Sequence, residues 1–213
     1  MGNAANRHRS NGARAVREQY DGAAASYDDR WNWYVHASIR ETLKRIPALE
    51  GNDARVLDLG CGTGALLERL PRESIRVGAD LSVGMLAVAN ERLPSDVHFA
   101  AADAGQLPFA SNSFDLVVSS SSFHYWPEPE PGLTEIHRCL KSGGWIVITD
   151  WCDDFLSCKL CDLWLQWVDP AHRRIFNAAA LTKFLEHAGF RGIQLDRYRI
   201  SVIWGLMTAI ARK

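Results

Sequence analysis

Apolar residues occur along this chain in two alternating patterns. Short apolar runs of strand length are separated by segments in which apolar residues recur at helical spacing, such as Ser82–Leu93 and Pro129–Leu140. The expected strands are Arg55–Leu59, Ile75–Asp80, Val97–Ala102, Phe114–Ser119 and Trp145–Thr149. Alternating strands and helices predict an α/β fold, a doubly wound and mainly parallel sheet with helices on both faces.

The last part of the chain breaks this alternation. Helices are expected over Asp153–Val168 and Ala178–Ala188, with Gly189 at the C-terminal cap of the second. Two strand-like runs, Arg191–Arg199 and Gly205–Ala211, follow without a helix between them. Because a parallel crossover needs a dozen or more residues, these runs predict an antiparallel pair at one sheet edge.

The composition is that of one folded domain. The chain has 213 residues, of which 47% are hydrophobic and 23% charged, so it can bury a complete core. Residues 1–12 are expected to be a disordered tail, and residues 13–50 carry mostly helical signals. We therefore expect a single domain over 13–213, with an α/β core at 54–213.

A glycine-rich turn follows the first strand. Gly60, Gly62 and Gly64 alternate after the apolar run, and a helical pattern starts at Ala65. Glycine lets the backbone approach a ligand closely because it lacks a Cβ atom and permits positive φ. The N–H groups at a helix start also suit anionic or polar ligand atoms. The turn therefore predicts a site for a nucleotide-like cofactor.

Acidic residues near three strand ends narrow the choice of cofactor. Asp58 lies at the end of the first strand, Asp80 ends the second, and Asp103 follows the third. Ligands of open α/β sheets bind beyond the carboxyl ends of the strands, so we expect these carboxylates to face one crevice. Asp80 would accept hydrogen bonds from ribose hydroxyls, and Asp103 from an exocyclic amine. The glycine spacing differs from the Gly-x-Gly-x-x-Gly of dinucleotide folds, which weighs against an NAD-dependent oxidoreductase.

These motifs resemble those of class I S-adenosylmethionine-dependent methyltransferases. The matching stretches are Val56–Gly64, the spaced Asp80 and Asp103, Phe114–Val118 and Leu140–Val147. The likeness is closest to the small-molecule branch that includes quinone-biosynthesis methyltransferases. It implies a seven-stranded Rossmann-like sheet with an antiparallel last strand and a helical lid at 13–50. It also implies S-adenosyl-L-methionine as cofactor and S-adenosyl-L-homocysteine as product.

The resemblance assigns residues to this cofactor. Asp58 and the glycine turn would hold the methionine part, Asp80 the ribose, and Asp103 the adenine. Tyr20 and Tyr27 lie where the family has its lid; an aromatic face can stabilise a sulfonium, and packing of the lid explains both residues equally well. The full expected set is Tyr20, Tyr27, Asp58, Gly60, Cys61, Gly62, Gly64, Asp80, Leu81, Met85, Asp103, Ala104 and Ser119.

The methyl acceptor is expected beside the loop after the fourth strand, Ser119–Pro127. His124 is the candidate catalytic base because its ordinary pKa suits proton transfer near neutrality, and a role as pocket wall is equally open. The other residues of the expected acceptor pocket are Tyr125, Trp126, Asp150 and Trp151. Methyltransferases acting on base amines usually have an Asn/Asp-Pro-Pro-aromatic run here, which four serines replace in this chain.

The helix at Asp153–Val168 has apolar residues on two sides. One stripe is Leu156, Leu160, Leu163 and Trp167, and the other is Cys158, Cys161, Leu165 and Val168. A helix apolar on two sides is buried twice, so we expect it under an apolar acceptor, a lid or the partner of a homodimer as well as on the body. No metal is expected at Cys152, Cys158 and Cys161, because zinc spacing of a further Cys or His pair is missing.

Charge and hydropathy limit the partners. The net charge of −1 argues against nucleic acid, and no segment has the apolar length of a membrane span. Five cysteines without regular pairing fit a reducing cytoplasm. We expect a cytoplasmic enzyme that methylates O, N or C of a small, partly apolar molecule. An RNA or protein methyltransferase and a non-catalytic S-adenosylmethionine-binding regulatory module are the alternatives.

Overall fold

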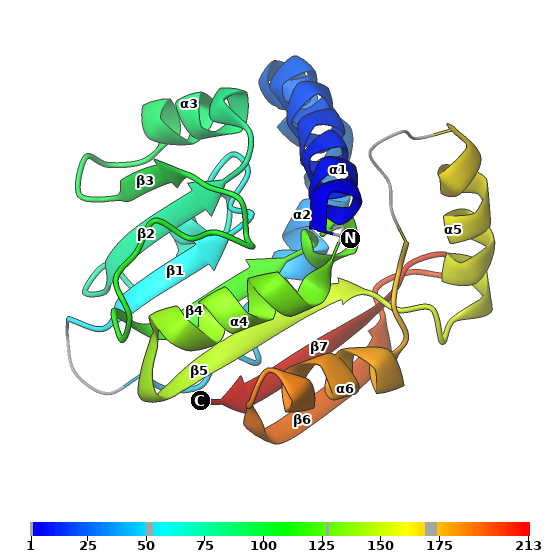
Figure 1. The fold of residues 1–213 in the computed structure, drawn as a ribbon. Coiled ribbons are helices and arrows are strands. Elements are labelled where there is room, and N and C mark those ends of the chain that lie inside the picture. The colour runs from blue at the N-terminus through cyan, green and yellow to red at the C-terminus, as the bar shows by residue number, and fades with distance from the viewer. Residues whose placement is uncertain (1, 50–52, 127, 169–173) are drawn as a thin grey trace.

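A seven-stranded sheet forms the centre of the computed structural model, which describes residues 2–49, 53–126, 128–168 and 174–213 (Figure 1). The strand order is β3-β2-β1-β4-β5-β7-β6. β1 to β5 pair in parallel, and β7 is antiparallel to both β5 and β6. The strands are β1 Arg55–Leu59, β2 Ile75–Asp80, β3 His98–Ala101, β4 Phe114–Ser120, β5 Leu140–Trp151, β6 Arg191–Arg199 and β7 Gly205–Arg212. The predicted sheet, with its antiparallel edge pair, is confirmed.

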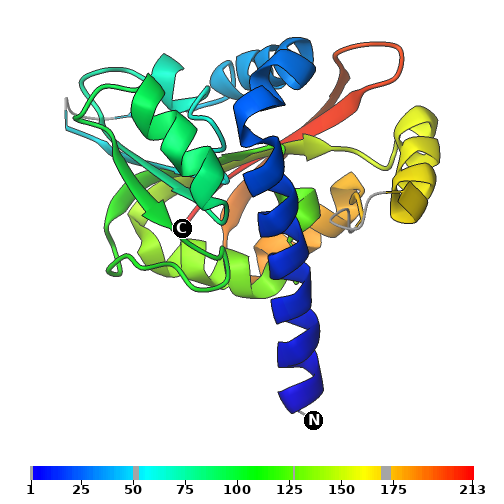
Figure 2. The ribbon, with the colours of Figure 1, turned by 90° about the horizontal axis from the view of Figure 1, so that it is seen from above.

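Helices cover both faces of the sheet, as Figure 2 shows from above. On one face, Leu133 of α4 and Leu181 of α6 pack into a core cluster with the sheet. On the other face, Ile39 of α2 and Leu86 of α3 do the same. The helices are α1 Gly2–Ala23, α2 Tyr27–Leu43, α3 Val83–Arg92, α4 Pro129–Cys139, α5 Leu156–Val168 and α6 Ala178–His187. Short 3₁₀ turns are η1 Ala24–Ser26, η2 Leu67–Arg69 and η3 Phe123–Tyr125.

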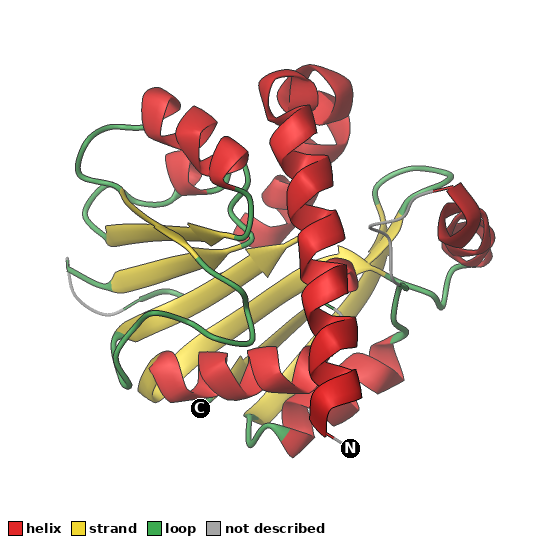
Figure 3. Cartoon of the chain, turned by 45° about the horizontal axis from the view of Figure 1, so that its top comes forward, coloured by secondary structure: helices red, strands yellow, loops and turns green. Residues whose placement is uncertain are grey.

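The helix α1 crosses in front of the sheet, near the carboxyl ends of its parallel strands (Figure 3). It begins at Gly2, ahead of residue 13, where the sequence predicted order to begin. No proline precedes Pro47, so the strongest helix breaker is missing from this region, although Gly12 lies inside the helix. The division into a tail, a lid and a core remains a prediction.

The helix predicted from Ala65 is wrong. Only the 3₁₀ turn η2 follows the glycine turn. Pro71 comes directly after Leu70, which is extended at φ −71° and ψ 152°, because a residue before proline is disfavoured in the α region. Leu66 and Leu67 bury their side chains in the core instead. The backbone of the turn, and no helix N-terminus, therefore faces the predicted site.

The helix α5 lies at the end of the molecule far from α3 (Figure 1). Cys158 is fully buried against the backbone of Ile203 and Gly205. The opposite stripe is exposed, with relative exposures of 69% at Leu156, 59% at Leu160, 55% at Leu163 and 91% at Trp167. Within the described part of this chain the helix is therefore buried on the side of Cys158, and its other apolar stripe is exposed.

Candidate functional site

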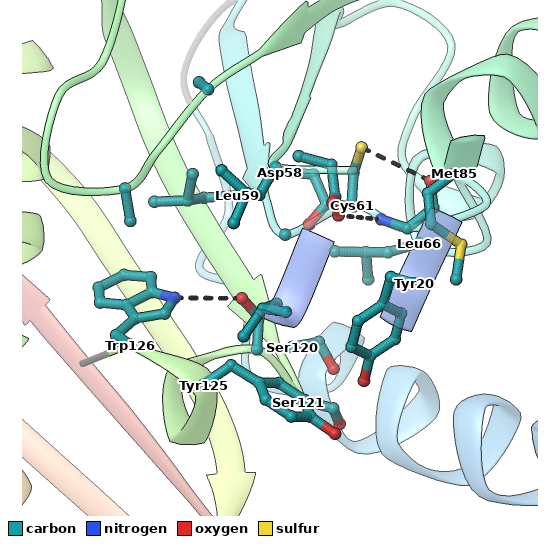
Figure 4. A pocket seen from close by; sticks show the side chains of 18 of the residues that line it. Tyr20, Asp58, Leu59, Cys61, Leu66, Met85, Ser120, Ser121, Tyr125 and Trp126 are labelled. Carbon is teal, nitrogen blue, oxygen red and sulfur yellow. Dashed lines mark hydrogen bonds between the residues drawn. The ribbon is translucent and has the colours of Figure 1, made fainter. Parts of the chain in front are cut away.

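A cavity lies at the carboxyl ends of β1, β2 and β4, closed on one side by α1 and α2 (Figure 4). It brings together most of the residues predicted for the cofactor. These are Tyr20, Tyr27, Asp58, Gly60, Cys61, Gly62, Asp80, Leu81, Met85, Asp103 and Ala104. The lining also includes the predicted acceptor residues Tyr125 and Trp126. The strand ends thus form one crevice, as the spacing of the acidic residues predicted.

The glycine turn forms one wall of this cavity and needs glycine for two different reasons. All three glycines have positive φ, at 77° for Gly60, 52° for Gly62 and 81° for Gly64. A Cβ atom at Gly60 would lie 2.2 Å from Ser122 Oγ, so the turn and the loop after β4 meet there without a side chain between them. A Cβ atom at Gly62 would meet no described atom within 4 Å, so at this position glycine is favoured by the positive φ alone.

Asp58 is the most unusual group in the cavity. It is buried, with 2% relative exposure, and its Oδ2 has no hydrogen-bond partner among the described residues. Burial, reinforced by the negative charge of Asp80, raises the pKa of Asp58 to about 8. A carboxylate in this position is unstable alone and would be stabilised by a cationic ligand group.

The side chain of Asp80 is held by backbone N–H groups of two segments, the glycine turn and the start of α3. Its Oδ2 accepts from Gly62 N at 2.9 Å, and its Oδ1 accepts from Ser82 N at 2.9 Å. Burial still raises the pKa of Asp80, although these backbone donors oppose the shift. Asp103 Oδ1 accepts from Gly105 N at 2.8 Å in a tight turn after β3. The two carboxylates are therefore fixed in orientation by local backbone.

The N-terminal helices are bonded to the walls of the cavity through two acidic residues that the sequence analysis missed. Asp21 Oδ1 accepts from Ser82 Oγ at 2.6 Å and from Gly84 N at 2.9 Å. Asp28 accepts from Thr63 Oγ1 at 2.7 Å and from Arg92 Nη1 at 2.9 Å. No local motif marks Asp21 or Asp28, because their partners lie far along the chain.

Aromatic rings close the cavity on the lid side. Tyr20 contacts Tyr125 edge to face, with ring centroids 5.3 Å apart, and contacts Tyr27 at 5.8 Å. Burial raises the pKa of Tyr27 to about 12 and that of Tyr20 well above its ordinary value. Both phenols therefore stay neutral near physiological pH. Across the cavity, Trp126 Nε1 donates to Ser122 Oγ at 3.2 Å (Figure 4).

His124 does not line the cavity, because its ring is turned toward the end of β5. Its Nδ1 lies 2.7 Å from Asp150 Oδ1, and its backbone N–H donates to Asp150 Oδ2 at 3.0 Å. The imidazole stacks on Trp151, with ring centroids 5.2 Å apart. The three predicted acceptor residues His124, Asp150 and Trp151 thus form a buried layer behind the wall that carries Tyr125.

Two other predicted residues also lie away from the cavity. A Cβ atom at Gly64 would lie 2.6 Å from Leu93 Cδ1, so this glycine packs toward α3. Ser119 is buried in β4, and its Oγ lacks a hydrogen-bond partner among the described residues. The serines that do line the cavity are Ser120, Ser121 and Ser122, which the sequence showed only as a departure from another motif.

The described residues contain neither a metal-binding cluster nor a membrane-spanning helix. No three His, Cys, Asp or Glu side chains in that part of the chain are grouped as they would be around a metal ion. Every helix found there is too short or too polar to cross a bilayer.

Comparison with known proteins agrees with the geometry. Residues 57–148 match the family described as Methyltransferase domain. The malonyl-[acyl-carrier protein] O-methyltransferase of Marinomonas sp. (strain MWYL1) is 37% identical over 142 residues, covering 64% of this chain and 51% of that protein. The demethylmenaquinone methyltransferase of Clavibacter sepedonicus is 46% identical over 99 residues, covering 45% of this chain and 40% of that protein. The chain thus spans about half the length or less of these two relatives.

Solved structures share the fold over almost the whole chain. One example is a complex between the Haloferax volcanii Trm112 methyltransferase activator and a methyltransferase. The match has a TM-score of 0.78 at 23% identity and covers 91% of this chain and 96% of that one. At this identity the likeness speaks for the architecture alone.

Proposed function

This chain belongs to the class I S-adenosylmethionine-dependent methyltransferases, and from that premise we propose that it transfers a methyl group to a small, partly apolar molecule. One observation carries the proposal. Asp58 Oδ2 is buried without a partner among the described residues, beside the glycine turn of the cavity. An unpartnered buried carboxylate is costly, and a cationic group such as the α-ammonium of the cofactor would satisfy it.

The other described residues of the cavity fit the same cofactor. Asp80 accepts backbone hydrogen bonds, yet a carboxylate has about four lone-pair sites, so room remains for ribose hydroxyls. We assign Asp103 to the adenine amine. The remaining assignments are Ala104, Leu81 and Met85 to the adenine, Gly60, Cys61 and Gly62 to the methionine part, and Tyr20 and Tyr27 to the lid. Gly64 and Ser119 lie outside the cavity lining, where Gly64 would support the glycine turn and Ser119 would support β4.

Bound S-adenosyl-L-methionine supplies an electrophilic methyl group on a sulfonium sulfur. This chain's contribution is to exclude water and to hold the acceptor in line with that methyl group. Orientation of this kind reaches effective molarities of roughly 10⁵–10⁸ M. Tyr20 and Tyr125 meet over the cavity and so provide the exclusion of water.

We assign His124 a positioning role and no proton transfer. Its imidazole and its backbone N–H both hold Asp150, which fixes the loop that carries Tyr125 and Trp126. A catalytic base and a pocket-wall role are equally open from the sequence; the contacts with Asp150 and the position of His124 outside the cavity lining support the positioning role. A base is needed only where the acceptor must lose a proton.

The names of the two relatives support an acceptor that is a quinone-like or an acyl group. The net charge of −1 disfavours an RNA substrate, since phosphate binding needs cationic surface. The apolar residues Val35, Ile39 and Trp126 in the lining favour a partly apolar molecule.

Isothermal titration with S-adenosyl-L-methionine, S-adenosyl-L-homocysteine and NAD tests the cofactor. Both adenosyl compounds should bind and NAD should not. Asp58→Asn should weaken both by about 10- to 150-fold, the range expected for a hydrogen bond to a charged group. Asp53→Asn, a change at an exposed turn, is the matched control and should bind like the wild type. NAD binding, or equal affinity in Asp58→Asn, would contradict the assignment.

Labelled methyl transfer into a metabolite extract tests the reaction. Label should enter a small-molecule fraction and be absent from RNA and protein fractions. Incorporation into RNA or protein would favour those acceptors. Cofactor binding without incorporation into any fraction would favour a regulatory module.

A further inference from the structure

Beyond the strand-end carboxylates, the cavity has a second region between α2 and the loop after β4. We call it the acceptor arm, and its described lining is Val35, Ser38, Ile39, Ser120, Ser121 and Ser122. Figure 4 shows Ser120 and Ser121 on the same side of the cavity as the Tyr125 ring, across from Asp58. The arm thus has hydroxyl groups on an otherwise apolar surface.

A chain of hydrogen bonds reaches this arm from the protein interior, and we infer its direction from what each group can donate and accept. Trp151 Nε1 donates to Tyr34 Oη at 2.5 Å, and Tyr34 Oη lies 2.7 Å from Ser121 Oγ. Because an indole N–H is only a donor, the Tyr34 oxygen accepts there, and its buried phenol proton needs an acceptor of its own. Ser121 Oγ is that acceptor.

The proton of Ser121 is consequently left for the arm. Its contact within the protein is Ser38 Oγ at 3.5 Å, the outer limit of a hydrogen bond. Ser38 donates its own proton to Val35 O at 3.1 Å, so it can only accept from Ser121, and at 3.5 Å it does so weakly. Burial raises the pKa of Tyr34 well above its ordinary value, so this phenol keeps its proton and Ser121 remains a donor near neutral pH.

Ser121 also adopts a backbone conformation that serine rarely takes. Its φ is 57°, and its N–H donates to Thr149 O at 2.8 Å. Left-handed conformations of non-glycine residues cost free energy and cluster at functional sites. Glycine would adopt this backbone more easily, so the benefit of serine here is its hydroxyl group.

The charges around the cavity restrict which methyl acceptors can bind beside the Ser121 hydroxyl group. Four acidic residues line it: Asp58, Asp80, Asp103 and Glu128. Among the described lining residues, none is Lys, Arg or His. A carboxylate acceptor would therefore be desolvated among like charges, without a cationic side chain of the described lining to pair with it. A neutral molecule avoids this cost.

We propose that Ser121 donates a hydrogen bond to a carbonyl or phenol oxygen of a neutral, planar methyl acceptor in the acceptor arm. The proposal rests on the proposed methyl transfer and specifies its acceptor. Planarity suits the Tyr125 and Trp126 rings that line the same cavity, and the oxygen requirement follows from the hydroxyl donor at Ser121. Of the two acceptor types named for the relatives, a quinone-like ring satisfies both conditions and an ionised malonyl group does not.

Binding of three probes with the same ring system tests this. Naphthalene, 2-naphthol and 2-naphthoate are titrated at pH 7 into the protein saturated with S-adenosyl-L-homocysteine. Wild-type protein should bind 2-naphthol about tenfold more tightly than naphthalene, the effect of one hydrogen bond, and should bind 2-naphthoate least. Ser121→Gly should bind naphthol and naphthalene alike and should keep its affinity for S-adenosyl-L-homocysteine.

A matched control separates the hydroxyl from the backbone strain. Asn112 is another non-glycine residue with positive φ, at 56°, and it lies in an exposed turn. Asn112→Gly relieves the same kind of strain and should leave all three probe affinities unchanged. Tyr34→Phe removes the phenol that orients Ser121 and should reduce the naphthol preference by a smaller factor.

The outcomes separate this proposal from the proposed function. If S-adenosyl-L-homocysteine does not bind to the wild type, both are overturned. If it binds, the acceptor proposal alone is overturned by an unchanged naphthol preference in Ser121→Gly, by tightest binding of 2-naphthoate, or by failure of 2-naphthol to bind.

Discussion

The two halves of the cavity are built in different ways. The cofactor half consists of strand ends and turns, in which Asp58, Gly60 and Asp80 are placed by their own backbone segments. The acceptor arm is built from side chains that meet across the fold: Tyr34 and Ser121 are 87 residues apart. The first half depends on backbone conformation, and the second depends on tertiary packing.

This difference has a consequence for function. A site formed by β1, β2 and the glycine turn accepts few substitutions, because steric limits and buried charge restrict each position. A network of neutral hydroxyl groups can change one member at a time with moderate cost. We therefore expect substitutions in the cofactor half to weaken or abolish cofactor binding and those in the acceptor arm to alter which acceptor is preferred.

The largest effect is expected from Gly60→Ala, which strains the backbone of the cofactor half. The new Cβ atom would lie 2.2 Å from Ser122 Oγ at a φ of 77°. We expect a loss of about 3 kcal/mol in the free energy of unfolding, together with loss of cofactor binding. Chemical denaturation and titration calorimetry measure the two effects.

Gly143→Ala is the control for this substitution. Gly143 has nearly the same φ, 76°, but a Cβ atom added there would meet no described atom within 4 Å. Only the backbone strain should appear, so this variant should be less destabilised and should bind cofactor normally. Equal losses in both variants would show that the contact with Ser122 is unimportant.

A pH series tests the buried charge of the cofactor half. Since the pKa of Asp58 is raised to about 8, the unliganded carboxyl group is protonated at lower pH. Affinity for S-adenosyl-L-homocysteine should therefore rise by up to about tenfold per pH unit as the pH increases toward 8. In Asp58→Asn this slope should be absent, and a slope equal to that of the wild type would contradict the assignment.

The same carboxyl group should make the unliganded protein less stable at high pH. Its folded pKa lies above the unfolded value, so the folded state holds the proton more tightly. The free energy of unfolding should fall by up to about 1.4 kcal/mol per pH unit between roughly pH 4 and 8. Thermal denaturation of the wild type and of Asp58→Asn over this range measures the contribution, which the variant should lack.

An intermediate effect is expected at His124, behind the acceptor half. His124→Gln leaves Asp150 with a poorer partner in a buried position, and we expect about 1–3 kcal/mol of lost stability. Turnover should fall moderately, because the loop that carries Tyr125 becomes less well ordered. A variant that is as stable as the wild type but turns over a hundredfold more slowly would contradict the positioning role and support a catalytic base at His124.

The smallest effect is expected where the lid meets the cofactor half. Asp28→Ala removes the contacts to Thr63 and Arg92. Asp28 and Arg92 are partly exposed, so the loss should be about 1 kcal/mol. Stopped-flow measurement should show up to about fivefold faster release of S-adenosyl-L-homocysteine. Asp29→Ala, an exposed neighbour, should release it at the wild-type rate.

The contrast between the halves also explains what the sequence could predict. Asp58, Asp80 and the glycines lie at the ends of apolar runs, so spacing alone located them correctly in one crevice. Ser121 carries no such signal, because neither its left-handed backbone nor its contact with Tyr34 can be read from neighbouring residues. The direction of the His124 ring, the exposed stripe of α5 and the short turn after Gly64 likewise depend on tertiary packing.

The attachment of α1 has a consequence for how this protein is assembled. Asp21 finds its partners Ser82 and Gly84 only after 61 and 63 further residues have been made. Contacts of such long sequence separation form late because the intervening chain must first be ordered. β1 and β2 can therefore pair before α1 docks, because partners such as Val56 and Arg76 lie only 20 residues apart. A nascent chain would form this part of its sheet first and its enclosed binding chamber later.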